Sequence, residues 1–188
     1  MSGYFKLIIG PMYAGKSTEL LRSINKYKIL NKKIVVINHI INNRYGSTKL
    51  ITHDKKEYDD CIILENLSDL EQNYKTIFEA CDVIIIEELQ FFKDAYSNIV
   101  KWLDVDNKMI IAAGLDGDFM RKPFGDVLNL IPHANKVFKL NALCTKCCNG
   151  TKAEFTKRTS SEKEITLVGS NDLYEAVCRK HYLEYTKI

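Results

Sequence analysis

The amino-acid sequence predicts an α/β fold in which helices flank a mainly parallel sheet, followed by a small second domain. Three observations support this prediction. Short apolar runs alternate with segments of helical period along most of the 188 residues, as in folds whose strands are connected by helices. A glycine-rich loop follows the first apolar run, and cysteine and histidine residues pair near the end of the chain. We expect the first domain to cover residues 1–140 and the second to cover residues 141–188.

The first strand and the first helix enclose a phosphate-binding motif. Residues 4–9 are mostly apolar, as in a strand buried on both faces, and apolar residues at helical spacing follow from position 20. Between them, all fixed positions of G-x-x-x-x-G-K-[ST] are filled, by the run Gly10, Pro11, Met12, Tyr13, Ala14, Gly15, Lys16 and Ser17. Such a loop points backbone N–H groups at phosphate oxygens, while its lysine reaches the β- and γ-phosphates and its serine ligates Mg²⁺. An ordinary glycine-containing turn is the alternative, but the flanking strand and helix favour binding of a nucleoside triphosphate.

The next part of the chain predicts two more strands and a second helix. Residues 33–38 and 61–64 form apolar runs, separated by the polar segment 42–57, which we expect to be a loop or hairpin. Ser68 and Glu71 fit a capping box at the start of a helix. The apolar face of that helix is expected to consist of Leu70, Tyr74, Ile77, Phe78 and Cys81. Cys61 and Cys81 are therefore interpreted as core residues.

Two acids follow the apolar run 83–86, as in the Walker B arrangement. Ligands of open α/β sheets lie outside the carboxyl ends of the strands, so Glu87 and Glu88 are candidate functional residues rather than two solvated loop carboxylates. Adjacent residues of an extended chain point to opposite sides. One acid is thus expected to face the metal ion and the other the acceptor substrate.

The remaining elements of the sheet come before residue 141. Residues 95–103 have the spacing of a helix, and residues 109–113 and 137–140 predict two further strands. The loop between these strands carries Arg121 and Lys122. These cations could stabilise a transferring phosphoryl group or could equally be a solvated surface pair.

The late cysteines predict a structural zinc site. Cys144 and Cys147 form a C-x-x-C pair, and Cys178 and His181 form a C-x-x-H pair, which together supply the four ligands of a tetrahedral Zn²⁺. Cys148 is out of register and is expected to be free, although exchange of ligands is possible on spacing alone. A redox C-x-x-C is the alternative, but it would not need the second pair. The site closes a long loop of the kind that often forms a lid.

Composition excludes several classes of protein. Hydrophobic residues make up 46% and charged residues 27% of the chain, which is typical of a soluble globular protein. No apolar run reaches membrane-spanning length, and the first strand begins too early for a signal peptide. We therefore expect a cytoplasmic protein with no membrane partner. The net charge of +3 is small and no dense basic run occurs, so no nucleic-acid partner is expected.

Beyond these motifs, the chain resembles the type II thymidine kinases, a family found in cells and in large DNA viruses. The resemblance extends from Leu7 to about Tyr182. In chain order it rests on G-P-M-Y-A-G-K-S-T-E-L (10–20), R-Y (44–45), T-H-D (52–54), E-E-L-Q-F-F (87–92), L-D-G-D-F-M-R-K-P-F-G (115–125), the two metal-ligand pairs, T-K-R (156–158), E-K-E-I-T-L-V-G (162–169) and Tyr174. The family implies a P-loop kinase core with a zinc-binding ribbon or lasso domain.

The resemblance also implies an activity and its partners. The expected reaction transfers the γ-phosphate of ATP, with Mg²⁺, to the 5′-hydroxyl of thymidine, giving dTMP in the deoxynucleotide salvage that supplies DNA synthesis. Deoxyuridine is expected to be phosphorylated in the same way. The family further implies feedback inhibition by dTTP and a homotetramer.

The resemblance assigns site residues one by one. Glu88 matches the catalytic base, and Glu87 with Ser17 matches the Mg²⁺ site. Phosphate contacts would come from residues 10–17 together with Thr18, with weaker support from Arg44 and Arg121. The thymine ring would be surrounded by Met12, Phe91, Leu115, Phe119, Thr156 and Tyr174. Main-chain hydrogen bonds to the base would come from Ile165, Thr166, Leu167, Val168 and Gly169. For the apolar residues of this set, plain core packing is the alternative.

The chain departs from the family pattern at four positions. Glu87 replaces the usual aspartate, so that contact with Mg²⁺ either is direct or passes through water. His181 replaces the usual fourth cysteine, which Zn²⁺ accepts readily. Leu89 and Asn42 replace a common glycine and aspartate. Two other functions stay open: another phosphoryl transferase or ATPase, and a zinc-ribbon protein that binds nucleic acid, which the weak charge disfavours.

Overall fold

A six-stranded parallel sheet forms the centre of the computed structural model, which describes residues 2–42, 50–51, 57–160 and 173–184. The strand order is β5-β2-β6-β7-β1-β8, and each of the five pairings is parallel. The strands are β1 (Tyr4–Ile9), β2 (Ile34–His39), β5 (Cys61–Leu64), β6 (Val83–Ile86), β7 (Met109–Gly114) and β8 (Lys136–Lys139). The predicted α/β fold with a mainly parallel sheet is therefore confirmed.

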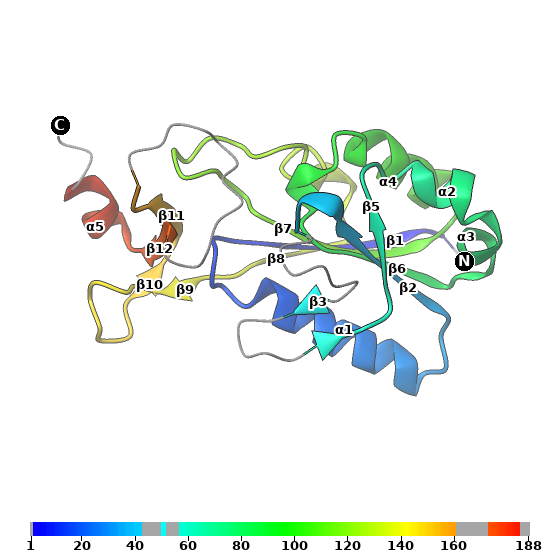
Figure 1. Ribbon diagram of the computed structural model, residues 1–188, viewed down its shortest axis with the longest axis horizontal. Helices are drawn as coiled ribbons and strands as arrows, with labels where there is room; N and C mark the ends of the chain where they lie inside the picture. The colour runs from blue at the N-terminus through cyan, green and yellow to red at the C-terminus, as the bar shows by residue number, and fades with distance from the viewer. Residues whose placement is uncertain (1, 43–49, 52–56, 161–172, 185–188) are drawn as a thin grey trace.

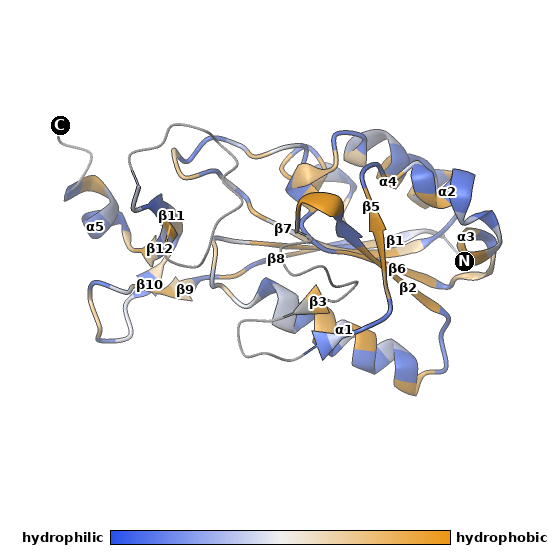
Figure 2. Ribbon diagram, viewed as in Figure 1, coloured by the Kyte–Doolittle hydropathy of each residue, from blue (hydrophilic) through white to orange (hydrophobic). Residues whose placement is uncertain are grey.

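Helices cover both faces of this sheet (Figure 1). They are α1 (Lys16–Ile29), α2 (Asp69–Asn73), α3 (Lys75–Ala80) and α4 (Ala95–Asp104), with single 3₁₀ turns at Ile40–Asn42, Leu89–Phe91 and Ile131–His133. Alternate residues of one strand face the two layers: Leu7 packs with the residues of α4, whereas Ile8 packs with those of α1. Figure 2 accordingly shows strongly apolar central strands between helices of mixed character. Burial on both faces explains why the strands read as unbroken apolar runs.

The helix expected to begin with a capping box at Ser68 differs from the prediction. Ser68 itself has helical dihedral angles and its side chain makes no capping hydrogen bond, although a capping residue normally lies outside the helical region. Instead, the Asp94 carboxylate accepts hydrogen bonds from the N–H groups of Leu67 and Ser68. The Glu71 carboxylate accepts from the side chains of Lys101 and Trp102. The predicted capping box is therefore wrong, because its carboxylate is used in tertiary contacts.

The same segment is two short helices rather than one. Tyr74 leaves the helical region at φ −128°, ψ 34°, and this separates α2 from α3. Because the second helix starts in a new direction, Tyr74 and Ile77 are 37% and 44% exposed, while Leu70 and Phe78 are buried. The expected continuous apolar face is thus wrong for Tyr74 and Ile77. Cys61 and Cys81 are both buried, as predicted.

The polar segment 42–57 is described only in part. Its end forms a short antiparallel pair, β3 (Leu50–Ile51) with β4 (Glu57–Tyr58), which agrees with a hairpin. Leu50 is fully buried in the cluster beneath α1. Arg44 lies outside the described residues.

Beyond β8, the chain forms a small unit at the end of the sheet where β1 leads into the phosphate loop (Figure 1). It consists of two antiparallel pairs, β9 (Ala142–Leu143) with β10 (Lys152–Ala153) and β11 (Phe155–Arg158) with β12 (Tyr174–Val177), followed by α5 (Arg179–Glu184). A separate apolar cluster fills this unit. In the ranges that the structure describes, no helix combines the length and the apolar character needed to cross a bilayer.

Candidate nucleotide site and metal centre

The phosphate loop requires glycine at two positions. Gly10 has φ +150°, and a Cβ atom there would lie 2.5 Å from the carbonyl oxygen of Leu140. Gly15 has φ +82° and directly precedes α1, a left-handed conformation that glycine adopts without steric cost. Lys16 and Ser17 then begin the helix, with Thr18 beside them in the first turn. The predicted strand–loop–helix context of the motif is therefore confirmed.

Lys16 points back into its own loop. Its ammonium group donates a hydrogen bond of 2.7 Å to the carbonyl oxygen of Pro11. Burial lowers the pKa of Lys16, and the carboxylates of Glu88, Asp116 and Glu87 act in the opposite direction. The lysine thus lies close to three acids at the carboxyl edge of the sheet, where a phosphate group would bring a further negative charge to it.

Glu87 and Ser17 meet beneath the loop. Glu87 is 5% exposed, and the Ser17 hydroxyl donates a hydrogen bond to its Oε1 atom. Burial, and next the charge of Glu88, raise the pKa of Glu87 to about 8, while the Ser17 hydrogen bond and Lys16 lower it. Among the described residues, the Glu87 Oε2 atom is buried without a hydrogen-bond partner. A hydroxyl oxygen beside a carboxylate oxygen that lacks a partner fits the oxygen ligands that Mg²⁺ prefers.

The side chains of Glu87 and Glu88 have different partners, but the backbone that separates them is not the extended one expected. The sequence predicted opposite directions from an extended backbone, but Glu88 has φ 53°, ψ 43° in the left-handed region. The chain therefore turns at Glu88 directly after β6. Its half-buried carboxylate accepts a hydrogen bond from the side-chain amide of Gln90, whereas Glu87 binds Ser17. The two acids thus have different protein partners, and their expected roles toward a metal ion and an acceptor substrate stay predictions.

Two predicted thymine-pocket residues, Thr156 and Tyr174, contact the phosphate loop. The backbone N–H of Met12 donates to Thr156 Oγ1 at 3.0 Å, and the Tyr13 hydroxyl donates to the carbonyl oxygen of Tyr174 at 3.2 Å. Thr156 lies on β11 and is 5% exposed. The small C-terminal unit is therefore in direct contact with the phosphate loop.

The loop after β7 is held by the same unit. The Tyr182 hydroxyl donates to the carbonyl oxygen of Phe119 at 2.7 Å. The guanidinium carbon of Arg158 lies 3.9 Å from the ring centroid of Phe119, and its Nη2 atom donates to the Tyr174 hydroxyl at 2.5 Å. Arg158 thus joins two of the predicted thymine-pocket residues, Phe119 and Tyr174.

The other predicted residues have varied surroundings. Leu115 is bound through its backbone N–H to Gln90 Oε1 at 3.0 Å. Phe91 packs against Phe124 with ring centroids 5.6 Å apart. The exposed Arg121 stacks on Tyr182, with 4.5 Å between its guanidinium carbon and the ring centroid. Arg44 and residues 165–169 lie outside the described residues, so their predicted roles stay predictions.

The four predicted metal ligands converge. The Sγ atoms of Cys144, Cys147 and Cys178 and the ring nitrogens of His181 supply ligand atoms that all lie within 4.8 Å of one another. His181 Nδ1 lies 3.5, 3.4 and 3.4 Å from the three sulfurs in that order, and Cys147 Sγ lies 3.8 Å from Cys178 Sγ. Tetrahedral zinc, with bonds of about 2.3 Å to sulfur and 2.0–2.1 Å to nitrogen, would place its ligand atoms roughly 3.5–3.8 Å apart. The donor set and its spacing therefore fit such an ion.

The cysteine thiols of this cluster are not equivalent. Burial acts to raise the pKa of Cys144, but N–H groups of the surrounding turn, that of Cys178 foremost, lower it to about 6. The Cys178 N–H lies 3.3 Å from Cys144 Sγ. Because the thiolate is the form that binds metal, this turn favours ligation. Cys148 is exposed and donates to the carbonyl oxygen of Thr145, so its thiol stays outside the cluster, as predicted.

Three residues that contact the site received no individual role from the sequence. Gln90 binds Glu88 and Leu115, Arg158 binds Phe119 and Tyr174, and Tyr182 binds Phe119. Gln90 and Arg158 lie within motifs that carry the family resemblance, and this is the one signal that could have singled them out. Their contacts join segments distant in sequence, which local patterns do not reveal.

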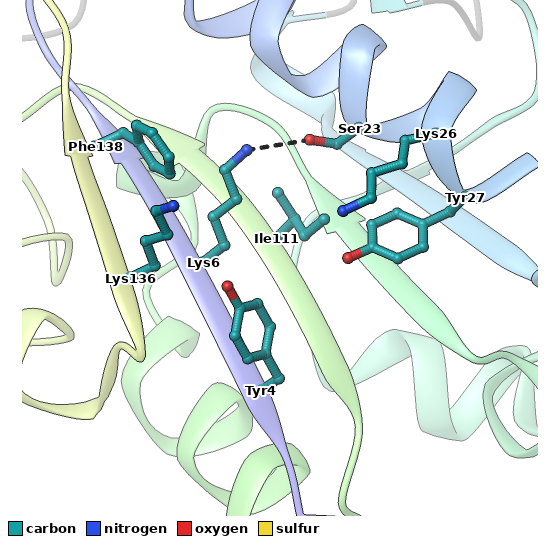
Figure 3. Close-up of a pocket in the computed structure, with 8 residues that line it drawn as sticks. All are labelled: Tyr4, Lys6, Ser23, Lys26, Tyr27, Ile111, Lys136 and Phe138. Atoms are coloured by element: carbon teal, nitrogen blue, oxygen red, sulfur yellow. Dashed lines mark hydrogen bonds between the residues drawn. The ribbon is translucent and has the colours of Figure 1, made fainter. Parts of the chain in front are cut away.

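A small cavity of about 130 Å³ lies elsewhere, between β1, β8 and α1 (Figure 3). Lys6, Lys26 and Lys136 line it, together with aromatic rings. Lys6 is paired with Glu19 at 2.7 Å, and the other two ammonium groups lie over the rings of Tyr27 and Phe138. No residue predicted for the nucleotide or metal site lines this cavity, so it is a separate feature of the sheet surface.

Known proteins are similar to this chain over nearly its whole length. A family profile described as thymidine kinase matches residues 3–182. The chain is 43% identical to the thymidine kinase of vaccinia virus (strain Western Reserve) over 188 residues, which covers 97% of this chain and 98% of the viral protein. Over the same shares of both chains it is 42% identical to thymidine kinase of monkeypox virus and 41% identical to that of variola virus. Among solved structures, a DNA replication initiation factor shares 13% identity at a TM-score of 0.45, over 73% of this chain and 40% of that chain, which is too distant to indicate a function. Full-length similarity to the viral enzymes and the match of the profile show that the chain belongs to the thymidine kinase family.

Proposed function

We propose that this chain is an ATP:thymidine 5′-phosphotransferase (EC 2.7.1.21), which transfers the γ-phosphate of ATP to the 5′-hydroxyl of thymidine, and also of deoxyuridine. The observation that carries the proposal is the hydrogen bond from the phosphate loop at Met12 to Thr156 of the C-terminal unit. It brings the predicted nucleoside-binding unit against the triphosphate site in a member of the thymidine kinase family.

The phosphate loop would hold ATP. Its backbone N–H groups and the start of α1 would bind the β- and γ-phosphates, and Lys16 would exchange its hydrogen bond with Pro11 for a phosphate oxygen. Ser17 and Glu87 are the residues that would hold Mg²⁺, which neutralises charge on the transferring phosphoryl group. Ionised Glu87 would face that ion directly or through a water molecule.

Glu88 would act as the general base. It would accept the proton of the nucleoside 5′-hydroxyl while that oxygen attacks the γ-phosphorus and ADP leaves. A positioned base contributes typically about 10²–10⁴-fold in rate, and the remainder would come from alignment and from the positive charges of Lys16 and the metal ion. Arg44 and Arg121 would have weaker supporting roles at the phosphates.

The C-terminal unit would bind the thymine base. We propose residues 1–140 and 141–188 as the two domains, with the second anchored by Zn²⁺ on Cys144, Cys147, Cys178 and His181. Thr156, Tyr174 and Phe119 lie where this unit meets the loops of the first domain. Met12, Phe91 and Leu115 would line the same pocket, and a close fit around the thymine methyl group would disfavour purines. Residues 165–169 would supply main-chain hydrogen bonds to the base.

The proposed role is deoxynucleotide salvage in the cytoplasm. There dTTP, the end product of the pathway, would act as a feedback inhibitor, and the enzyme would assemble as a homotetramer. A flat dose response to dTTP, or a monomer at all concentrations in sedimentation, would contradict these two points separately.

One assay distinguishes this function from its alternatives. Purified protein with Mg·ATP should produce ADP only when thymidine or deoxyuridine is added. Production of ADP without an acceptor would indicate an ATPase, and production stimulated by DNA would indicate a nucleic-acid-dependent protein. A matched pair of variants then tests the base: Glu88→Gln should lower kcat by about 10²–10⁴-fold with ATP still bound. The same change at the exposed Glu79 of α3 should leave kcat unchanged.

A further inference from the structure

Gln90 connects the proposed base to the proposed nucleoside pocket. It lies in the 3₁₀ turn after β6 and is 4% exposed. Its Nε2 atom donates a hydrogen bond of 2.5 Å to Glu88 Oε2, and its Oε1 atom accepts one of 3.0 Å from the backbone N–H of Leu115. One buried side chain therefore joins the ends of β6 and β7.

The chemistry of these partners fixes the orientation of the amide. A backbone N–H can only donate, so the atom facing Leu115 must be the amide oxygen. The NH₂ group must then face Glu88, where it donates to the carboxylate. No other orientation of the amide satisfies both contacts.

Close packing holds Gln90 in this place. A Cβ atom at Gly114 would lie 3.1 Å from Gln90 Oε1, and one at Gly125 would lie 2.4 Å from the Gln90 carbonyl oxygen. Gly125 also has φ +56°, so side chains are excluded there by conformation as well as by space. Neighbouring backbone thus approaches Gln90 from two sides.

Glu88 has a particular need for such a partner. Its side chain has several rotatable bonds and is only half-buried, so packing alone leaves the carboxylate several orientations. A general base must lie within about 2.6–3.2 Å of the proton that it accepts. The hydrogen bond from Gln90 selects one orientation of the Glu88 carboxylate. Because Gln90 is also hydrogen-bonded to Leu115, that orientation is fixed relative to the wall of the proposed pocket.

We propose that Gln90 is a positioning residue, which aligns the Glu88 carboxylate with the 5′-hydroxyl of a nucleoside seated against Leu115. The proposal rests on the proposed function, since it concerns the same base and the same pocket. In this role Gln90 acts through Glu88 and Leu115, the two residues to which its side chain is hydrogen-bonded. The Gln90 side chain thereby couples the position of the nucleoside in the pocket to the position of the Glu88 carboxylate.

Two substitutions separate the two hydrogen bonds. Gln90→Glu keeps an oxygen for the Leu115 N–H and replaces the donor to Glu88 with a second carboxylate. Gln90→Met has similar length and removes both polar contacts. We expect Gln90→Glu to lower kcat about 10- to 100-fold, as for a misaligned catalytic group, with the KM for thymidine within about twofold of wild type. Gln90→Met should lower kcat by a similar factor and also raise the KM for thymidine.

The readouts and the control make each outcome decisive. ATP binding without thymidine should be unchanged in both variants, and Gln72→Met, at an exposed position of α2, should match wild type throughout. If kcat stays within twofold of wild type in both variants, the proposal is overturned. Loss of ATP binding or of folding in both would likewise overturn it, because Gln90 would then be a purely structural residue. Failure of the wild-type protein to phosphorylate thymidine would instead refute the proposed function.

Discussion

The backbone N–H of Met12 donates a hydrogen bond of 3.0 Å to the side-chain oxygen of Thr156, 144 residues further along the chain. Met12 belongs to the phosphate loop, and Thr156 lies on β11, where it pairs with Ala176 of β12. The two halves of the proposed active site are therefore joined by a direct polar contact.

Replacing Thr156 with valine should weaken the contact between the phosphate loop and the C-terminal unit, while the similar shape of valine preserves the packing. The Met12 N–H loses its partner, which costs about 1 kcal/mol for a partly buried group. We expect a correspondingly lower free energy of unfolding and a severalfold higher KM for thymidine. Thr156→Ser keeps the acceptor and should behave nearly as wild type in urea unfolding and in steady-state kinetics. Equal behaviour of the two variants would show that the hydrogen bond is dispensable.

Arg158 should be sensitive even to replacement by lysine. Its planar guanidinium stacks on Phe119 while donating to the Tyr174 hydroxyl, and an ammonium group cannot do both. Arg158→Lys is expected to raise the KM for thymidine about tenfold while the KM for ATP stays unchanged. A parallel change at Arg22, which is 82% exposed on α1, provides the control. An unaltered thymidine KM in Arg158→Lys would exclude Arg158 from the pocket.

The raised pKa of Glu87 should make the stability of the protein depend on pH when metal and nucleotide are absent. Its pKa is raised from 4.5 to about 8 in the folded state, so between these values the folded state holds a proton that the unfolded state has lost. Stability should therefore fall as pH rises across this interval, by about 1.4 kcal/mol per pH unit from this group. Glu87→Gln should remove that part of the slope in urea unfolding at pH 5.5, 6.5 and 7.5. An identical slope in both proteins would contradict the assignment.

The metal centre should accept cysteine but not alanine at position 181. His181→Cys gives a four-thiolate site, which zinc binds well, whereas His181→Ala leaves three ligands and opens the site. We expect one zinc per chain by mass spectrometry under native conditions in wild type and in His181→Cys, and loss of zinc in His181→Ala. Chelation of the wild-type protein should unfold the C-terminal unit, because metal binding there contributes folding free energy. Full activity without metal would refute a structural role.

The sheet could be predicted because its strands are buried on both faces. In β6 every residue is buried. Because both faces of the strand are covered, every position is apolar, and the apolar run alone indicates the strand. The metal ligands could be predicted because Cys144 and Cys147, like Cys178 and His181, are close in sequence, and each pair has the spacing of a metal-binding turn. In both cases the signal is local.

The errors arose where tertiary contacts determined the outcome. Ser68 lacks its expected cap because Asp94, from a different segment, supplies the carboxylate. The helix breaks at Tyr74, where periodicity alone favoured continuation. Gln90 could not be assigned a role because its second partner, Leu115, is brought near only by the pairing of β6 with β7. Local patterns contain no information about such partners.

The apolar cluster around the cysteine ligands also contains Tyr13 and Ala14 of the phosphate loop. With zinc at the proposed site, one wall of the proposed triphosphate site would pack against residues that the ion holds together. A newly synthesised chain would become competent only after acquiring that ion, so loading with metal would act as the maturation step of the enzyme. Scarcity of zinc in the cell would then limit the proposed activity even where the polypeptide is abundant.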